Sequence, residues 1–320
     1  MGYMARREVE KITDPRQRAR FIKRTLWIIL VLNIVVAGAK YFYGLATHST
    51  AMQADGIHSA FDATGNVIGL ISIVIASRPA DSNHPYGHAK FETFAASILG
   101  ALLLVAAFSI GYEAVTNLIA QAAPVQVTPI SFIVMFATLV INISVTSYEH
   151  YAAKRSASEV LNADAAHTLS DVLVSLGVIV GLFFVWLGFN LADSIAALLV
   201  SAMIVYTAVG IFRMAVRSLS DEAMLPEQEI LACVLRHPGV RSCHQVRTRG
   251  IPSQIYIDFH ILVDPLMSVQ SSHGLAETIE KDLRQKFPAV SDVTIHIEPD
   301  NEKERQEATT IHFDIKKSAD

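Results

Sequence analysis

Two stretches of the chain repeat one arrangement of ionisable residues. "ADGIHSAFD" runs from Ala54 to Asp62, and "ADAAHTLSD" runs from Ala163 to Asp171. Both follow the pattern A-D-x-x-H-x-x-x-D within long apolar segments. If such a segment crosses a membrane, a charged side chain near the bilayer centre costs about 2.5–3.5 kcal/mol. A lone polar residue in such a segment often serves as a hydrogen-bonding partner between helices, which is worth about 1 kcal/mol. Two matched sets predict a metal-binding function instead.

A helical conformation would place the polar side chains of each stretch on one face, because residues three, four and seven apart project in similar directions. One helix would then present His58 and Asp62, and the other would present His167 and Asp171. Side by side, they would offer two imidazole nitrogens and two carboxylate oxygens, a tetrahedral set that Zn²⁺ accepts.

The first acids of the two stretches, Asp55 and Asp164, are interpreted differently. We expect them to orient the histidines or to lie as polar groups near helix ends, outside the set of ligands.

The composition predicts a membrane-spanning half followed by a soluble half. Of the 320 residues, 52% are hydrophobic and the mean hydropathy is +0.37, too apolar for an ordinary soluble domain. Charges are sparse between residues 26 and 212. A bilayer core needs about 20 apolar residues per helix. The six expected spans are 26–46, 51–76, 91–119, 130–148, 160–188 and 192–212.

Basic residues predict the orientation of these spans. The arm at residues 1–24 contains eight Lys and Arg, and further basic residues follow in alternate connections. The other connections, "THST", "AQAAPVQVT" and "GFNLAD", contain neither Lys nor Arg. Because basic loops stay in the cytoplasm, both termini are predicted to be cytoplasmic. No cleavable signal peptide is expected before the first span.

After residue 218 the pattern becomes that of a small α+β domain. The expected elements are helix 226–236, strands 240–248 and 254–263, helix 269–287 and strand 293–299, an α-β-β-α-β order of the metallochaperone or ferredoxin-like type. The predicted organisation is a basic arm at 1–24, a six-helix domain at 25–217, the α+β domain at 218–300 and a charged, flexible tail at 301–320. Within the tail, "TIHFDI" is compatible with a short strand.

Three motifs, in this order, resemble the cation diffusion facilitator family. They are "HSAFD", "HTLSD" and, between the second and third spans, "DSNHPYGHAKFE". The resemblance extends from about Arg24 to Pro299 and includes the six spans and the α+β domain. It implies a homodimeric exporter in a cell membrane of the bacterial inner-membrane type, exchanging divalent metal, usually Zn²⁺, for protons by alternating access.

The resemblance places the transport site on His58, Asp62, His167 and Asp171. Many bacterial relatives have Asp where this chain has His58. A second imidazole favours zinc over harder ions such as Mn²⁺, and leaves Cd²⁺, Co²⁺ and Fe²⁺ as alternatives.

Two further metal sites are predicted. Asp81, His84 and His88 lie around a Pro and a Gly in one loop, a carboxylate and two imidazoles that suit a second zinc. In the soluble domain the resemblance implies a structural or regulatory binuclear zinc site at the dimer interface. Its implied ligands are His244, His260, His273, His296 and Glu298, the last where Asp is common in the family.

The resemblance also implies a charge interlock between Lys90 and Asp221. Two other features receive structural interpretations. Tyr148, Glu149 and His150 are interpreted as an interfacial cluster whose polar tips reach toward water. Asp193 is interpreted as a helix N-cap.

Other function classes fit less well. No basic stripe indicates nucleic-acid binding, and Cys233 and Cys243 give no disulfide framework. An intramembrane zinc enzyme remains an alternative, although H-E-x-x-H and G-x-S-x-G are absent and four ligands leave no position for water. A metal sensor, or a channel without proton coupling, is the second alternative.

Overall fold

The computed structural model describes residues 11–12, 14–46, 50–120, 129–186 and 192–306. In the second helix it describes side chains from Ala63 onward. The chain divides into two units, Met1–Val216 and Arg217–Asp320.

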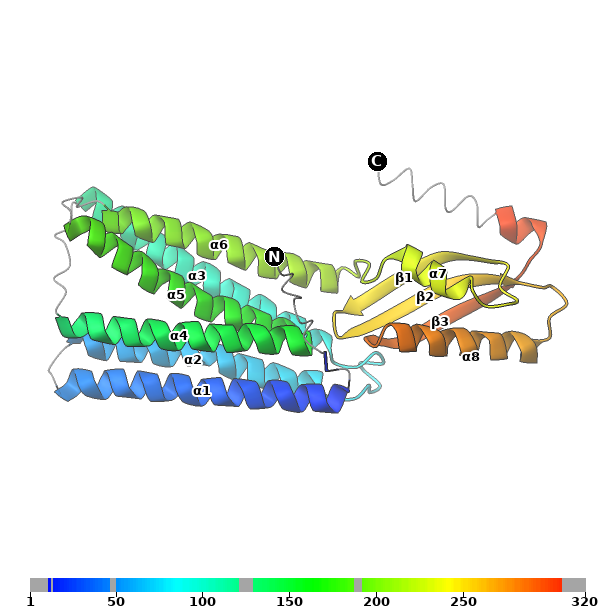
Figure 1. Ribbon diagram of the computed structural model, residues 1–320, viewed down its shortest axis with the longest axis horizontal. Coiled ribbons are helices and arrows are strands. Elements are labelled where there is room, and N and C mark those ends of the chain that lie inside the picture. The colour runs from blue at the N-terminus through cyan, green and yellow to red at the C-terminus, as the bar shows by residue number, and fades with distance from the viewer. Residues whose placement is uncertain (1–10, 13, 47–49, 121–128, 187–191, 307–320) are drawn as a thin grey trace, which may run out of the picture. The chain divides into compact units, whose positions relative to one another are not determined.

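Within the described residues, six long helices make up nearly all of the first unit, and they run alongside one another (Figure 1). They are α1 (Pro15–Ala46), α2 (Thr50–Ala76), α3 (Lys90–Ala120), α4 (Pro129–Ser156), α5 (Glu159–Trp186) and α6 (Ala192–Leu219). The shortest has 27 residues. At about 1.5 Å per residue, each therefore exceeds the roughly 30 Å thickness of a hydrocarbon core.

The outer surface of this unit is apolar. Phe108, Ile119 and Tyr206 are each at least 75% exposed. Among the described residues, three helical segments are long and apolar enough to span a membrane: Pro15–Ala39, Lys90–Ile119 and Ser194–Leu219. A helical membrane unit is therefore confirmed, and the apolar segment Ala63–Ala76 of α2 is shorter within the described residues.

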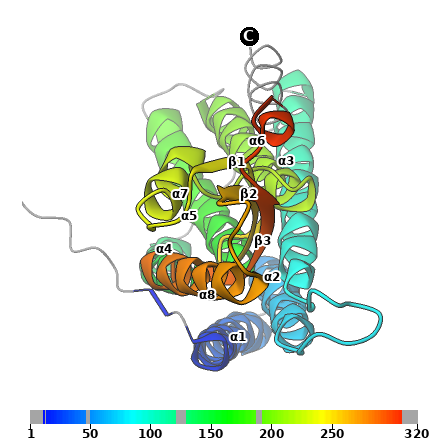
Figure 2. The ribbon, with the colours of Figure 1, turned by 90° about the vertical axis from the view of Figure 1, so that its right-hand side faces the viewer.

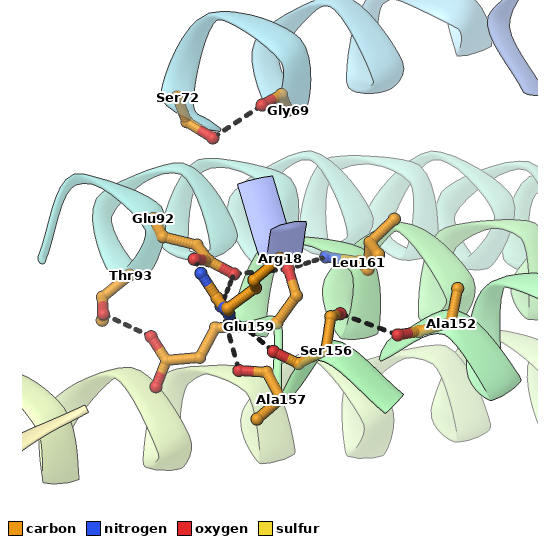
Figure 3. Close-up of polar contacts among 11 residues, drawn as sticks. Arg18, Gly69, Ser72, Glu92, Thr93, Ala152, Ser156, Ala157, Glu159 and Leu161 are labelled. Carbon is orange, nitrogen blue, oxygen red and sulfur yellow. Dashed lines mark hydrogen bonds and ion pairs between the residues drawn. The ribbon is translucent and has the colours of Figure 1, made fainter. Parts of the chain in front are cut away.

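A polar cluster joins the ends of four helices, and we call it the Arg18–Glu92 cluster (Figure 3). The Arg18 guanidinium lies 2.9 Å from Oε2 of Glu92, which is completely buried. Its Nε donates to the Ser156 carbonyl at 2.6 Å and its Nη2 to the Ala157 carbonyl at 3.2 Å. The Ser158 hydroxyl also donates to Glu92. The cluster thus fixes the starts of α1, α3 and α5 against the end of α4.

The second unit has the predicted α-β-β-α-β order. Its elements are α7 (Glu227–Val234), β1 (Ser242–Ile251), β2 (Gln254–Val263), α8 (Val269–Lys286) and β3 (Val290–Pro299). The strands follow the order β1-β2-β3, with β1 antiparallel and β3 parallel to β2. The α+β class of the soluble unit is therefore confirmed.

Alternation along β2 separates the two faces of this sheet. Ile257, Phe259 and Ile261 are buried in one core with residues of α7 and α8. Both helices cover the same face of the sheet (Figure 2). Because successive strand residues point to opposite faces, His260 lies on the face away from the helices.

The beginning of the predicted tail is anchored to this unit. Residues 302–306 are helical, and the Arg305 guanidinium pairs with the Asp300 carboxylate. Arg305 and Arg241 together hold the pKa of Asp300 below its ordinary value. The stretch "TIHFDI" lies outside the described residues.

Candidate metal sites

The loop between α2 and α3 brings Asp81, His84 and His88 together. Oδ1 of Asp81 lies 3.3 Å from Nδ1 of His84, and its Oδ2 lies 3.3 Å from Nε2 of His88. The centroids of the two imidazole rings are 4.3 Å apart. One potential ligand atom from each residue lies within 4.8 Å of the others, a separation that suits binding of one metal ion.

Backbone hydrogen bonds shape this loop. The His84 amide donates to Asp81 Oδ1 at 2.7 Å, and the amide of Gly87 donates to the His84 carbonyl at 2.9 Å. Gly87 has φ +84°, which favours glycine. The His84 amide lowers the pKa of Asp81, so this carboxylate is ionised at neutral pH. Nδ1 of His88 is buried without a hydrogen-bond partner among the described residues.

Three histidines form a row across the sheet of the soluble unit. His244 pairs with His260 between β1 and β2, and His260 pairs with His296 between β2 and β3. Glu298 lies beside the row: its Oε1 is 2.7 Å from Nδ1 of His260, and its Oε2 is 3.2 Å from Nε2 of His244. One potential ligand atom from each of His244, His260 and Glu298 lies within 4.8 Å of the others, a separation that also suits one metal ion.

The remaining predicted ligands of this domain lie at different distances from that group. Nε2 of His296 is 3.7 Å from Oε1 of Glu298, at the edge of the group. His273 lies on α8, where its side chain is 73% exposed and 3.3 Å from Glu277. Within the described part of one chain, His273 is therefore not brought together with the other four.

A bulge in β1 orients His244. The register shifts between His244 and Arg247, and Gln245 has φ +50°. The extra residue lets Cys243 and Val246 both pack against the core while His244 stays on the opposite face. Burial lowers the pKa of His244, which favours the neutral imidazole that metals bind. Burial raises the pKa of Cys243 to about 12, so its thiol stays protonated.

The repeated motifs lie on α2 and α5, and the structure describes side chains for one of them. His167 and Asp171 occupy consecutive turns of α5 and are partly buried. The side chains of His58, Asp62 and Asp55 lie outside the described residues, although their backbone belongs to α2.

A polar chain joins α2 to α5 one turn from the predicted metal ligands. The Asn66 amide donates to Oδ2 of Asp164 at 2.6 Å, and the Asn33 amide of α1 donates to Oδ1 of Asn66 at 2.9 Å. Asn66 and Asp164 are each 2% exposed. A Cβ added at Gly65 would lie 3.5 Å from Oδ1 of Asp164, an ordinary van der Waals distance, so α2 packs directly against this carboxyl group. Asp164 is thus a buried, hydrogen-bonded group rather than a helix-end residue.

The interpretation of Glu149 as an interfacial residue is wrong. Its neighbours Tyr148 and His150 are exposed, but Glu149 is completely buried. Because successive helical residues are about 100° apart, neighbours in the sequence point in different directions. Glu149 points into the bundle, where it lies against the carboxyl group of Asp164.

Family models match almost the whole described chain. The model of the cation efflux transmembrane domain matches residues 26–220, and that of the cation efflux protein, cytoplasmic domain, matches residues 225–300. This chain belongs to the cation diffusion facilitator family.

Cation diffusion facilitators from distant organisms are similar to it. Metal tolerance protein C1 of Arabidopsis thaliana is 34% identical over 84% of this chain, which spans 61% of the plant protein. The cation-efflux pump FieF of Yersinia enterocolitica is 29% identical over 89% of this chain and 95% of the pump. The metal-bound C-terminal domain of the CzcD transporter from Thermotoga maritima is 34% identical and covers 24% of this chain and 99% of that domain, with a TM-score of 0.23.

Membership of the cation diffusion facilitator family decides the general function. The protein is a membrane transporter that moves divalent metal cations outward, and it is not an enzyme. The alternative of an intramembrane zinc enzyme is therefore excluded.

Two predictions for this cation diffusion facilitator concern residues that belong to separate units or lie outside the described part of the chain. Lys90 begins α3 and Asp221 follows α6, in different units of the chain, so their interlock stays a prediction. The side chain of Asp193 lies outside the described residues.

Sequence reasoning missed Asn66 and Glu149. Asn66 follows Asp62 by one turn on the same face of α2, so the spacing that identified His58 and Asp62 also pointed to it. No comparable spacing marks Glu149, because its partner lies on another helix.

Proposed function

We propose that this cation diffusion facilitator exports Zn²⁺ from the cytoplasm in exchange for protons. The transport site is formed by His58 and Asp62 of α2 with His167 and Asp171 of α5, and alternating access exposes it to each side in turn. Both termini lie in the cytoplasm. Cd²⁺, Co²⁺ and Fe²⁺ are the alternative substrates that this donor set leaves open.

The contact between α2 and α5 carries this proposal. Asn66 bonds Asp164, and three residues later on α2 a Cβ added at Gly69 would lie 3.5 Å from Val160, which precedes Asp164. Residue numbers increase from Asn66 to Gly69 on α2, whereas those of their neighbours on α5 decrease from Asp164 to Val160. The two helices are therefore antiparallel. Continuing this pairing by one turn sets Asp62 opposite His167, and by two turns sets His58 opposite Asp171.

The chemistry of these four residues explains proton exchange. Zinc binds neutral imidazole and ionised carboxylate, so metal binding releases protons and acid competes with metal. An ordinary histidine titrates near pH 6.5. His58 and His167 therefore carry protons when the empty site returns to the cytoplasmic side.

Two further parts of the proposal concern the cytoplasmic side. The loop residues Asp81, His84 and His88 form a lesser zinc site. In the soluble unit His244, His260, His296 and Glu298, with His273, bind zinc at the interface of a homodimer. Zinc bound there favours one arrangement of the dimer and so biases the membrane unit. A charge interlock of Lys90 with Asp221, which defines how the subunits meet, is part of the same proposal.

Reconstituted vesicles test the transport proposal. The purified full chain is placed in vesicles that contain a zinc-sensitive dye and have a more acidic lumen than the bath. Zinc added to the bath should enter the lumen, and collapsing the pH gradient should slow its entry. Asp171→Asn should lower the initial rate by about tenfold or more, because one ligand is lost.

The matched control is Asp292→Asn, which neutralises an exposed aspartate of β3 and should keep the rate of the unaltered protein. Equal rates with and without the pH gradient would contradict proton exchange. An unchanged rate in Asp171→Asn would contradict the assigned transport site.

A further inference from the structure

Glu149 is a completely buried carboxyl group that the transport mechanism above does not use. It lies on α4, which packs against α5 and α1. Neither of its carboxylate oxygens receives a hydrogen bond within the described part of the chain. Burying an ionised carboxylate with no donor is among the most costly arrangements in a protein interior.

The neighbours of Glu149 make the ionised form still less favourable. Its carboxyl group lies at hydrogen-bonding range of Asp164, which is an acceptor when ionised. The nearby hydroxyl of Thr168 donates to the backbone carbonyl of Asp164 at 3.3 Å. Two ionised carboxylates in contact repel each other, and one proton between them turns this repulsion into a hydrogen bond.

The hydrogen bonds indicate which of the two acids holds that proton. Asp164 accepts the 2.6 Å hydrogen bond of the Asn66 amide, and Asn66 in turn accepts from Asn33. This chain of donors stabilises an ionised Asp164. The donor that the structure places near Glu149 is the Thr168 hydroxyl, which is directed to a backbone carbonyl instead, so the proton belongs on Glu149, which donates it to Asp164.

Charged groups from the adjoining helices connect this pair to the metal site. On α5, Asp164 and Asp171 interact electrostatically with Glu149, and His167 interacts electrostatically with Asp164. From α2, Asp62 and His58 lie one and two turns beyond Asn66 in the sequence. From α1, Asn33 joins the chain, and the nearest described cation before it is Arg24, about 13 Å away along the helix.

We propose that Glu149 and Asp164 form a proton-binding site beside the metal site, and that Glu149 is a proton carrier of the exchange in addition to the histidines. This proposal rests on the proposed function. When a divalent cation binds at the transport site, its positive charge offsets the negative charge of Asp171. The free-energy cost of ionising Glu149 beside Asp164 then becomes smaller. Glu149 then loses its proton to water on the side that is open, and regains one when the metal has left.

Counting protons tests the pair directly. The purified full chain in detergent is titrated with zinc alone in a weakly buffered solution containing a pH indicator, and protons released per zinc bound are measured. Glu149→Gln should bind the same amount of zinc and release about one proton fewer, because glutamine has no proton to give up. In vesicles the same variant should move about one proton fewer per zinc.

Glu159→Gln is the matched control, because Glu159 is also buried but accepts a hydrogen bond from Thr93. This variant should release as many protons as the unaltered protein. If Glu149→Gln fails to fold, Asp164→Asn replaces it: the new amide can donate to Glu149, so the shared proton is no longer needed. Infrared spectroscopy of the unaltered protein gives an independent measurement, since a protonated carboxyl band should disappear when zinc binds.

The outcomes separate this proposal from the one on which it rests. If the unaltered protein exchanges protons and Glu149→Gln exchanges just as many, the proton site is wrong and the transport proposal stands. Loss of a bound zinc ion in Glu149→Gln would make Glu149 a metal ligand and overturn the proton site. Absence of the infrared band has the same consequence. If zinc binding and transport in the unaltered protein involve no protons, both proposals fail.

Discussion

In the described part of the chain, histidines and carboxylates come together at three places, and each group depends on a different local geometry. In the loop, a turn around Gly87 gathers Asp81, His84 and His88 from nearby positions in the sequence. In the soluble unit, strand register aligns residues that are far apart in the sequence. On α5, helical spacing sets His167 and Asp171 on consecutive turns.

His260→Ala tests the group on the sheet. His260 occupies the middle of the histidine row and contacts Glu298 at 2.7 Å, so its loss removes a central ligand. Zinc affinity of the soluble unit should fall by about 10- to 100-fold. Zinc bound per full chain is measured by atomic absorption, in the Asp171→Asn background so that the transport site contributes less.

His237→Ala is the control, because His237 pairs with Asp282 at 3.4 Å and has no proposed metal role. His273→Ala adds a second comparison. A loss as large as that of His260→Ala would indicate that His273 reaches the group from a partner subunit. Unchanged affinity in His260→Ala would refute the metal group itself.

At the scale of elements, α2 approaches both α1 and α5 closely at Gly69. A Cβ added at Gly69 would lie 3.2 Å from Leu26 of α1 and 3.5 Å from Val160 of α5. Small residues allow helix backbones to approach closely in membranes, where apolar lipid provides little force to drive helices together.

Gly69→Val should therefore separate these helices. Added volume in a packed contact costs about 1–3 kcal/mol. We expect a lower apparent melting temperature in detergent and slower zinc uptake in vesicles. Gly210→Val is the control, because a Cβ at Gly210 of α6 meets no atom within 4 Å. Equal effects of the two variants would show that valine in a helix, rather than helix separation, is responsible.

At the scale of the whole helical unit, the Arg18–Glu92 cluster joins segments that are distant in the sequence. A single guanidinium contacts the start of α3 and the connection between α4 and α5, where Ala157 has φ +47°. Because Glu92 is completely buried, its charge depends on this partner.

Arg18→Ala should destabilise the helical unit more than removal of an exposed charge does. Leaving a buried ion without its partner costs about 3–5 kcal/mol. The apparent melting temperature in detergent should fall clearly, whereas Arg20→Ala, which removes an exposed arginine of the same helix turn, should change it little. A similar melting temperature for both variants would contradict the importance of the cluster.

The sequence by itself determined the features that follow from local periodicity and composition. Apolar length identified six helices, and strand alternation identified the α-β-β-α-β order. Residues close in sequence, such as Asp81, His84 and His88, were grouped correctly because a short loop keeps them near one another. These features depend on the backbone within one element or one loop.

Tertiary structure alone decided the features that depend on contacts between elements. Glu149 looked like an interfacial residue because its neighbours are polar, yet the packing of α4 against α5 buries it beside Asp164. His244, His260 and His296 became one row through strand register, while His273, on a helix that covers the other face, did not join them. The physical reason is that helical and strand periods fix which residues share a face, whereas the pairing of faces depends on packing between distant parts of the chain.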